Sequence, residues 1–554
     1  MSAGTDMQLK QAEAMRSTEA ALARKDTAGA VEIARLALDQ GIEHPVLLNL
    51  RAYWHECAER DEDAHRDLLR ARALAPDDIT VLNALGLSFG RLNLPREAIG
   101  CFQRVIDLQP EFGPAWFNKA WSSEQIGEIA TARECYERAI TLIPQSSGPV
   151  ANLASLLTRF GQWDAAKALA ERALALDPQS ARAELTLATI EQTFGQTQAA
   201  EARLQQLLAR RDLPTSQQAQ ALSQLGDLLD LRDETAEAFQ CYTACNALSR
   251  ERYARIYAPT GVPMMTELLG WLLPLFETQQ PDQWPAADPG FAEPGGPAQH
   301  VFLLGFPRSG TTLLEQMLDS HPDAVTSGER DTISEAVGAL TGTPDNILRL
   351  SAMRGAALSR HRRRYWERVR SYGFDVAGKV FVDKQPVNTL HLPLITKLFP
   401  KARILFALRD PRDVVLSCFR RRFEINESNF EMLTLEDTAR YYDRLMRLSE
   451  RYRACLPLTL REVRHEALVE DFEAQTRDIC AFIGLEWNEA MRNFAEHARS
   501  RAIATPSAFQ VTKGLNREGF GQWRRYASDM APVLPILEPW VERWGYPRTD
   551  SGKE

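Results

Sequence analysis

The chain has 554 residues, 44% of them hydrophobic and 25% charged, a composition that is ordinary for a globular protein with more than one domain. Its net charge of -9 excludes a globally basic nucleic-acid binder, so any cationic site must be local. Residues 1–30 lack an apolar signal-peptide core, and no run of about 18 apolar residues occurs. Together with eight scattered cysteines, these features predict a cytoplasmic protein without a membrane span.

A period of 34 residues runs through the first half of the chain. Small residues recur in two registers and prolines in a third: Ala52, Gly86, Ala120, Ala154 and Ala188; Ala64, Ala98, Ala132, Ala166 and Ala200; Pro76, Pro110, Pro144 and Pro178. A small residue at a fixed place in each of two helices lets the helices pack closely, and the proline ends the second helix. Phe102 and Tyr136 each follow a second-register alanine by four positions and would wedge between helices. An irregular last unit carries Gly226, Ala238 and Tyr242 in the matching places.

This pattern resembles the tetratricopeptide repeat family over residues 11–250. The resemblance implies an all-α, right-handed superhelix whose concave face binds peptides or protein partners. A structural spacer and a dimerisation surface remain open as other interpretations, so a homodimer stays among the hypotheses. Residues 251–297 predict a helix followed by a linker, because five prolines fall between 281 and 297.

The remainder of the chain, 298–545, alternates short apolar runs with helical patterns. The candidate strands are His300–Leu304, Val380–Val382, Arg403–Leu408 and Leu458–Val463. This alternation predicts an α/β domain with a mainly parallel sheet. Ligands of such domains bind at the carboxyl ends of the strands, where the sequence motifs of this region fall.

The first motif, VFLLGFPRSGTTLL (301–314), is nearly a phosphate-binding P-loop. The P-loop lysine is replaced by Thr311, and the basic residue is Arg308 inside the loop. The backbone N–H groups, the hydroxyls and the planar guanidinium of Arg308 are suited to binding an anion. The predicted phosphate-binding residues are Pro307, Arg308, Ser309, Gly310, Thr311 and Thr312. Without the lysine, and with no obvious Walker-B aspartate, magnesium-assisted triphosphate chemistry is poorly served, so we expect no metal.

The second motif is RILFALRDPRDVVLSCF (403–419). Arg409 follows the predicted strand, and Ser417 lies about two turns into the next helix. This pair could hold a second phosphate. Arg412 is an alternative, although a surface ion pair with Asp410 or Asp413 is the commoner role for such a residue.

The two motifs in this order resemble the sulfotransferase family, over roughly residues 298–530. That family uses 3′-phosphoadenosine 5′-phosphosulfate (PAPS) as co-substrate. The resemblance implies that PRSGTT binds the 5′-phosphosulfate and that Arg409 and Ser417 bind the 3′-phosphate. The segment PRSGTTLLEQMLDSHPDAVTSGE is most similar to the protein-tyrosine sulfotransferases.

The same resemblance implies catalytic roles. Glu329, after Gly328, is placed as the base of the tyrosine enzymes, and Lys384 in VDKQP and Ser507 in TPSAFQV match residues expected, with Arg308, to stabilise the leaving oxygen. Three other interpretations stay open: Glu329 pairs with Arg330, Lys384 is a surface residue, and Ser507 caps a turn.

Two further positions belong to the predicted nucleotide site. Lys513 falls where another phosphate-binding lysine is expected. His465 stands in VRHE (463–466) where many relatives carry a tyrosine, so it either substitutes for that contact or loses it. Thr332 replaces an arginine that reads acidic peptides, and the preference for acidic acceptors therefore does not transfer. The basic segment Arg360–Arg370 is either a solvated helix face or an acceptor-side rim.

The function predicted from these residues is transfer of a sulfuryl group from PAPS to an acceptor hydroxyl. The leading acceptor is tyrosine of a protein or peptide docked by the repeats, and a carbohydrate or small-molecule hydroxyl is the alternative. A P-loop nucleotide kinase and a non-catalytic scaffold are hypotheses of a different class.

Overall fold

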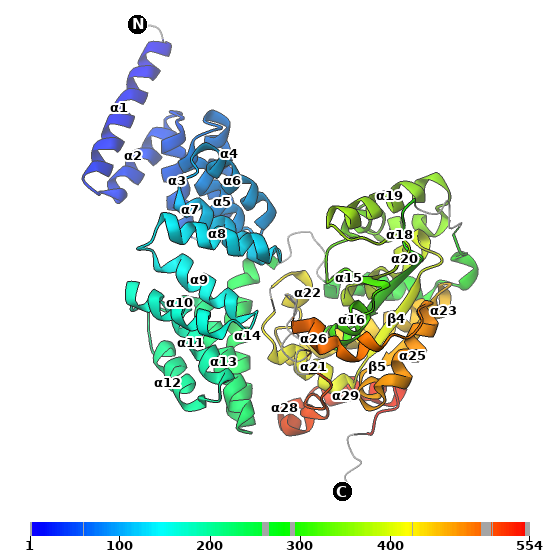
Figure 1. The fold of residues 1–554 in the computed structure, drawn as a ribbon. Coiled ribbons are helices and arrows are strands. Elements are labelled where there is room, and N and C mark those ends of the chain that lie inside the picture. The colour runs from blue at the N-terminus through cyan, green and yellow to red at the C-terminus, as the bar shows by residue number, and fades with distance from the viewer. Residues whose placement is uncertain are drawn as a thin grey trace. The chain divides into compact units, whose positions relative to one another are not determined.

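The computed structural model describes residues 3–58, 60–257, 265–287, 294–423, 425–499, 511 and 514–548. The chain divides into two compact units, Met1–Ala200 and Glu201–Glu554. Figure 1 draws the first in blue to cyan and the second in the later colours. In the described residues, no helix combines the length and the hydropathy that crossing a membrane would require.

The first unit consists of helices packed in sequential pairs, such as α3 on α4 and α5 on α6. Their bounds are α1 (Ala3–Ala23), α2 (Thr27–Asp39), α3 (Pro45–Cys57), α4 (Asp61–Leu74), α5 (Ile79–Arg91), α6 (Pro95–Leu108), α7 (Gly113–Gln125), α8 (Ile129–Leu142), α9 (Ser147–Thr158), α10 (Trp163–Leu176), α11 (Ala181–Thr193) and α12 (Thr197–Leu208), which continues into the second unit.

The small residues of the 34-residue repeat lie where these helices touch. Ala64, Ala98 and Ala132 have no exposed surface. A Cβ added to Gly86 would lie 2.5 Å from the ring of Phe102, so the wedge residue fits only because its neighbour has no side chain. The predicted tetratricopeptide fold is confirmed by this packing.

The second unit begins with the last repeat pair, α13 (Thr215–Leu231) and α14 (Thr235–Tyr257), which pack on each other. A Cβ on Gly226 would lie 2.8 Å from the Tyr242 ring, the same arrangement as in the first unit. Asn246 of α14 donates to the backbone carbonyl of Phe419 at 2.9 Å, which joins the repeat pair to the α/β domain.

A five-stranded sheet in the order β2-β3-β1-β4-β5 forms the centre of the α/β domain, and all neighbouring strands are parallel. The strands are β1 (Gln299–Gly305), β2 (Ala324–Thr326), β3 (Val380–Lys384), β4 (Arg403–Leu408) and β5 (Thr459–Arg464). The predicted parallel α/β fold is thus confirmed. The strand that the sequence missed, β2, has only three residues.

Helices cover both faces of the sheet. Along β1, Val301 and Leu303 belong to one hydrophobic cluster while Phe302 and Leu304 belong to another, because successive side chains of a strand point to opposite faces. The helices are α15 (Met265–Glu277), η1 (Pro281–Gln283), α16 (Thr311–Asp319), α17 (Ser334–Leu340), α18 (Pro344–Ala352), α19 (Ala356–Ser371), η2 (Pro386–His391), α20 (Leu392–Leu398), α21 (Pro411–Arg420), α22 (Glu427–Phe430), α23 (Leu435–Cys455), α24 (His465–Glu470), α25 (Phe472–Ile483), η3 (Glu489–Asn493), α26 (Phe494–Arg499), η4 (Gln522–Tyr526), α28 (Ala527–Met530) and α29 (Leu534–Arg543).

The segment between the repeats and β1 contributes to this core. Phe276 of α15 packs edge-on against Tyr452, with ring centroids 4.6 Å apart, and Trp284 is 1% exposed. The proline-rich stretch therefore carries at least one anchoring side chain.

Candidate active site

The loop between β1 and α16 is shaped to surround an anion. Arg308 and Gly310 have φ angles of 68° and 99°, so the chain turns sharply before α16 begins at Thr311. A Cβ on Gly310 would lie 2.7 Å from the Nδ1 atom of His465, so glycine is required there. Ser309 turns inward and donates its hydroxyl to the carbonyl of Phe306 at 2.7 Å. The N–H groups of the first turn of α16 have no partner inside the helix and suit a phosphate.

Arg308 is 8% exposed and lines a cavity of about 210 Å³ at the carboxyl end of β1. Its Nε atom donates to the hydroxyl of Ser417 at 3.0 Å. Burial, followed by repulsion from Arg421 and Arg409, lowers the pKa of Arg308 to about 9. A bound anion would offset both effects.

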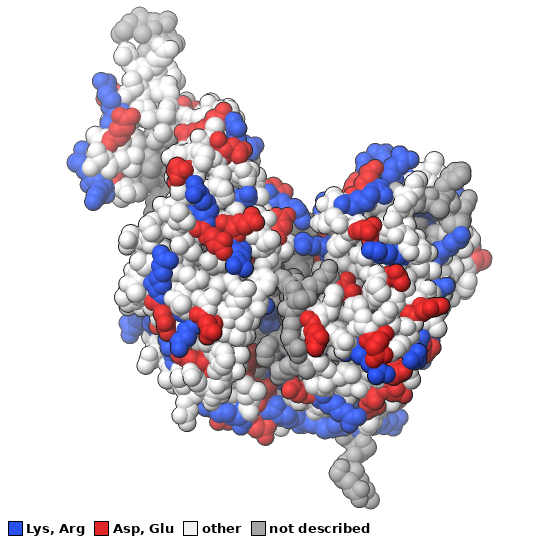
Figure 2. Space-filling view, viewed as in Figure 1, with Lys and Arg blue, Asp and Glu red and all other residues white. Residues whose placement is uncertain are grey.

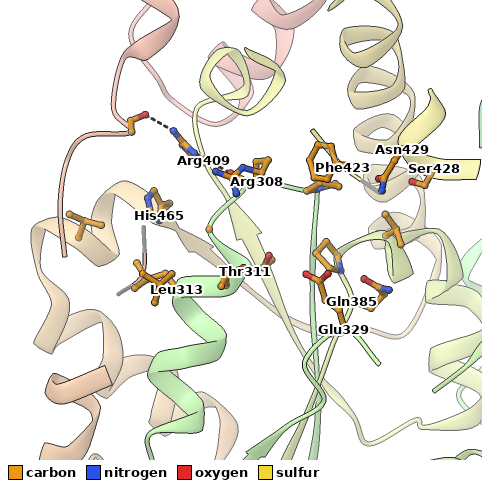
Figure 3. Close-up of a pocket in the computed structure, with 18 of the residues that line it drawn as sticks. Arg308, Thr311, Leu313, Glu329, Gln385, Arg409, Phe423, Ser428, Asn429 and His465 are labelled. Carbon is orange, nitrogen blue, oxygen red and sulfur yellow. Dashed lines mark hydrogen bonds between the residues drawn. The ribbon is translucent and has the colours of Figure 1, made fainter. Parts of the chain in front are cut away.

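Arg409 lies beside Arg308, as Figure 3 shows. One of its terminal nitrogens donates to the carbonyl of Arg308 at 3.2 Å and the other to the carbonyl of Gly519. Its buried Nε atom has no hydrogen-bond partner among the described residues. The two predicted phosphate sites are therefore adjacent, and Ser417 contacts Arg308.

His465 begins α24 and lines the same end of the cavity. Burial and the nearby charges of Arg409 and Arg308 lower its pKa to about 3, so its imidazole is neutral. Its buried Nδ1 atom has no partner within the described part of the chain. Phe520 packs edge-on against the ring at 5.7 Å. His465 thus occupies the predicted place and offers an unused ring nitrogen.

Glu329 approaches the cavity from another element, the segment after β2. It follows Gly328, and both residues have a positive φ, 63° for Gly328 and 61° for Glu329. This conformation is strained for a residue with a side chain and occurs often at functional sites. The backbone N–H of Glu329 donates to the carbonyl of Lys384 at 3.2 Å, which fixes the segment against the end of β3.

Lys384 is fully buried at the end of β3 and does not line the cavity. Its ammonium donates to Glu329 and lies 3.2 Å from a carboxylate oxygen of Glu315 on α16. The interpretation of Lys384 as a surface residue is therefore wrong. Burial opposes the charged form, but the two carboxylates outweigh it and raise the pKa of Lys384.

Asp383, which the sequence did not single out, organises the same strand end. It has no exposed surface and accepts hydrogen bonds from Thr332 at 2.6 Å, Tyr365 at 2.5 Å and Ser327 at 3.4 Å. Ser327 also accepts from the backbone N–H of Lys384 at 2.8 Å. Thr332, expected to leave an acidic-peptide contact unmade, holds the segment that carries Glu329.

The far end of the cavity has a different lining. Figure 3 shows Glu329 and Gln385 together and apart from the two arginines, while Phe423, Asn429 and Ser428 form a row that leads from Arg308 away from Arg409. Gln385 belongs to the predicted motif VDKQP, directly after Lys384, but was not singled out; Phe423, Ser428 and Asn429 lay outside the predicted motifs. Ser507 and Lys513 lie outside the described residues.

Two basic residues of α21 form ion pairs with carboxylates. Arg412 forms an ion pair with Asp410 at 2.8 Å, but the pair is buried and not on the surface, and the guanidinium lies 4.1 Å over the ring of Trp523. Arg420, at the end of α21, pairs with Asp230 of α13.

The basic helix α19 has a solvated face. Arg364 pairs with Glu335, and Arg368 lies 3.8 Å from Asp331. Figure 2 shows blue side chains gathered over this helix with red ones among them.

A glycine-bounded loop at a strand end, converging arginines and a carboxylate across the cavity give this α/β domain a site suited to an anionic ligand beside a proton-accepting group. Residues 300–489 match the model of the family described as Sulfotransferase family, and residues 83–147 and 157–225 match models described as Tetratricopeptide repeat. The chain therefore carries a sulfotransferase domain, an enzyme domain, preceded by tetratricopeptide repeats.

Individual relatives are distant. An uncharacterized protein of Aquifex aeolicus (strain VF5) is 27% identical over 248 residues, 43% of this chain and 32% of its own length. Protein-tyrosine sulfotransferase 1 of Danio rerio is 27% identical over 270 residues, 44% of this chain and 72% of its own. The chain thus spans about a third of the Aquifex protein. The solved structure of Pseudomonas aeruginosa pilF is 20% identical, covers 37% of this chain and 92% of its own, and has a TM-score of 0.32.

Proposed function

We propose that the chain transfers a sulfuryl group from PAPS to an acceptor hydroxyl. The observation that carries this proposal is the cationic end of the cavity, where Arg308 and Arg409 lie side by side and the buried Nε atom of Arg409 has no partner among the described residues. Buried polar groups without partners are rare and call for a ligand. A donor with phosphate groups at two positions would supply the missing acceptors.

The residues present fit that donor. When bound, PAPS supplies the sulfuryl group that is transferred. The N–H groups of the loop and of the first turn of α16, with Arg308, would hold the 5′ end, and Arg409 with Ser417 would hold the 3′-phosphate. His465 would contact the nucleotide through its neutral ring, because a protonated ring is disfavoured beside the arginines. Ser507 and Lys513 remain predictions of the family resemblance.

Glu329 is the group that would take up the proton of the acceptor hydroxyl. Its side chain is 36% exposed and lines the cavity, whereas the side chain of Lys384 is fully covered. For Lys384 to stabilise the leaving oxygen directly, its ammonium, which is fully buried and does not line the cavity, would have to become accessible to the donor.

Tyrosine of a protein or peptide is the acceptor that we propose. Several relatives are named protein-tyrosine sulfotransferases, such as two that match 44% and 43% of this chain, which supports this choice over a carbohydrate hydroxyl. The repeats supply a surface suited to docking such a protein. We propose no preference for acidic acceptors, since the uncharged residues Gln385, Phe423 and Asn429 line the far end of the cavity.

The test separates donor binding from transfer. The full chain is titrated by calorimetry with 3′-phosphoadenosine 5′-phosphate (PAP) and, separately, with ATP and Mg²⁺; the proposal expects binding of PAP. Labelled sulfate transfer from PAPS to tyrosine peptides, oligosaccharides and a lysate then identifies the acceptor. Lys384→Met, at the end of β3, is measured in the same assays. Its matched control is Lys379→Met, directly before the start of that strand. Binding of ATP and Mg²⁺ without PAP would overturn the proposal.

A further inference from the structure

The buried lysine of the site has two carboxylate partners, and only one of them is needed as a base. Lys384 Nζ is hydrogen-bonded to Glu329 and lies 3.2 Å from Glu315 Oε2. Glu315 is 2% exposed, comes from the middle of α16, and does not line the cavity. It therefore touches neither donor nor acceptor, and the proposed reaction leaves it without a role.

The charge balance of this cluster supplies one. Two carboxylates and one ammonium carry a net charge of -1. When Glu329 takes up the proton of the acceptor hydroxyl, the cluster becomes neutral, and Lys384 keeps a charged partner in Glu315. Without Glu315, the same proton uptake would leave a fully buried ammonium unpaired, which is strongly unfavourable.

We infer that Glu315 is a positioning residue that keeps Lys384 charged and in place while Glu329 accepts the proton; this inference rests on the proposed sulfuryl transfer. The surrounding groups agree with it. Asp383, next to Lys384 in β3, is turned away from the ammonium and accepts from Thr332 and Tyr365, so it does not compete with Glu315 as a partner of Lys384. Burial raises the pKa of Glu315, and the charge of Lys384 opposes that rise.

The first test replaces the charge and keeps the shape. In the full chain, Glu315→Gln is expected to lower kcat about tenfold or more, since one of two charges that balance Lys384 is lost. PAP affinity should not change, because the loop and Arg409 are untouched. Glu315→Asp, which keeps the carboxylate, should recover part of kcat. The control is Asp443→Asn. Asp443 lies on α23, does not line the cavity, and accepts a hydrogen bond from Trp540 at 2.9 Å.

A loss of kcat in Glu315→Gln without a loss of PAP affinity would exclude a merely structural role for Glu315. Thr311 and Thr312 stand at the start of the same helix as Glu315, so a disturbed α16 would weaken PAP binding together with kcat. Equal losses of PAP affinity and kcat in Glu315→Gln would overturn the inference.

A second measurement tests the charge balance without turnover. Lys384→Met should lower the unfolding temperature strongly, because the buried carboxylate of Glu315 then loses its cationic partner and faces the partly exposed carboxylate of Glu329. Adding Glu315→Gln to Lys384→Met should raise it again. A double variant no more stable than Lys384→Met alone contradicts the inference.

The outcomes also separate the two proposals. If the unaltered chain transfers sulfate and Glu315→Gln transfers it equally well, the role of Glu315 falls and the proposed function stands. If the unaltered chain neither binds PAP nor transfers sulfate, the proposed function falls first and the catalytic role of Glu315 with it.

Discussion

The two units of the chain bury different kinds of side chain. Among the described residues up to 200, Asp67 is the one buried residue that carries a charge. Arg51 pairs with it at 2.7 Å. The α/β domain buries a series of charged residues near the carboxyl ends of its strands: Arg308, Glu315, Asp383, Lys384, Arg409, Asp410, Arg412 and Asp413.

This difference separates what stabilises a unit from what the unit does. The repeats are held by small residues that let helices approach, an arrangement that needs no buried charge. Burying charge is costly unless it is paired, so its concentration in one unit marks a site where function outweighs stability. Variants at the buried and exposed charged residues test this contrast.

The largest effect is expected from the residues that face the cavity. Arg308→Ala and Glu329→Gln should each lower kcat about 100-fold or more, because one removes a charged donor and the other the base. Both proteins should stay folded by thermal unfolding. The matched control for the arginine is Arg447→Ala on the exposed side of α23. Wild-type turnover in either variant would remove that residue from the site.

The next effect concerns the junction of α13 with the α/β domain. Asp230 accepts from Arg525 at 2.8 Å, from Tyr526 at 2.6 Å and from the buried Arg420. Asp230→Ala should lower the free energy of unfolding by about 3 kcal/mol, since Arg420 loses this carboxylate partner. Urea unfolding of the full chain measures the loss.

The control for that variant lies one turn further along. Asp233 accepts from the same Arg525 at 2.8 Å but is 79% exposed. Asp233→Asn, which removes the charge and suits the positive φ of 65° at this position, should cost less than about 1 kcal/mol. Equal losses at the two positions would mean that burial does not distinguish them, against the contrast between the units.

The sequence predicts much of this architecture, because repeats and strand-end loops are local patterns. The spacing of Ala64, Ala98 and Ala132 defines the array, and the loop around Arg308 with Arg409 defines the donor end. Long-range pairing is not a local pattern. Asp230 meets Arg420 across 190 residues, and Lys384 meets Glu329 across 55.

Burial is the other quantity that the sequence hides. Glu315 and Asp383 look like ordinary members of a helix and a strand, and the strand β2 is too short for its periodicity to be read. The surface ion pair expected for Arg412 is buried under Trp523 for the same reason.

A third prediction uses the pKa of Asp383. Burial raises it to about 6, against hydrogen bonds that lower it. The unfolded value is about 4, so between about pH 4 and pH 6 the folded state binds one proton more than the unfolded state, and stability falls as pH rises through that window. The total fall from this group is at most about 3 kcal/mol.

Asp383→Asn should remove that contribution. The difference in free energy of unfolding between variant and unaltered chain should shift in favour of the variant as pH rises from about 4 to 6 and stay constant above. Burial also raises the pKa of Asp413 to about 6, so a parallel slope persists in the variant. A difference that is independent of pH would contradict the assignment.

The smallest effect is expected on the array, and it tests docking. Tyr53, Leu87 and Trp121 are 34 residues apart and 49%, 41% and 38% exposed, so three successive repeats present a large apolar side chain at the same position. Exposed aromatic side chains in register are a common basis for partner binding.

Tyr53→Ala with Trp121→Ala should raise KM for a docked protein acceptor about threefold to tenfold. Turnover of a short tyrosine peptide and the unfolding temperature should not change, because these side chains hold little of the core. Phe194→Ala is the control, since Phe194 is 59% exposed but outside this register. An array that serves only as a spacer would show the same KM in all three proteins, and the repeats would then owe their spacing to packing alone.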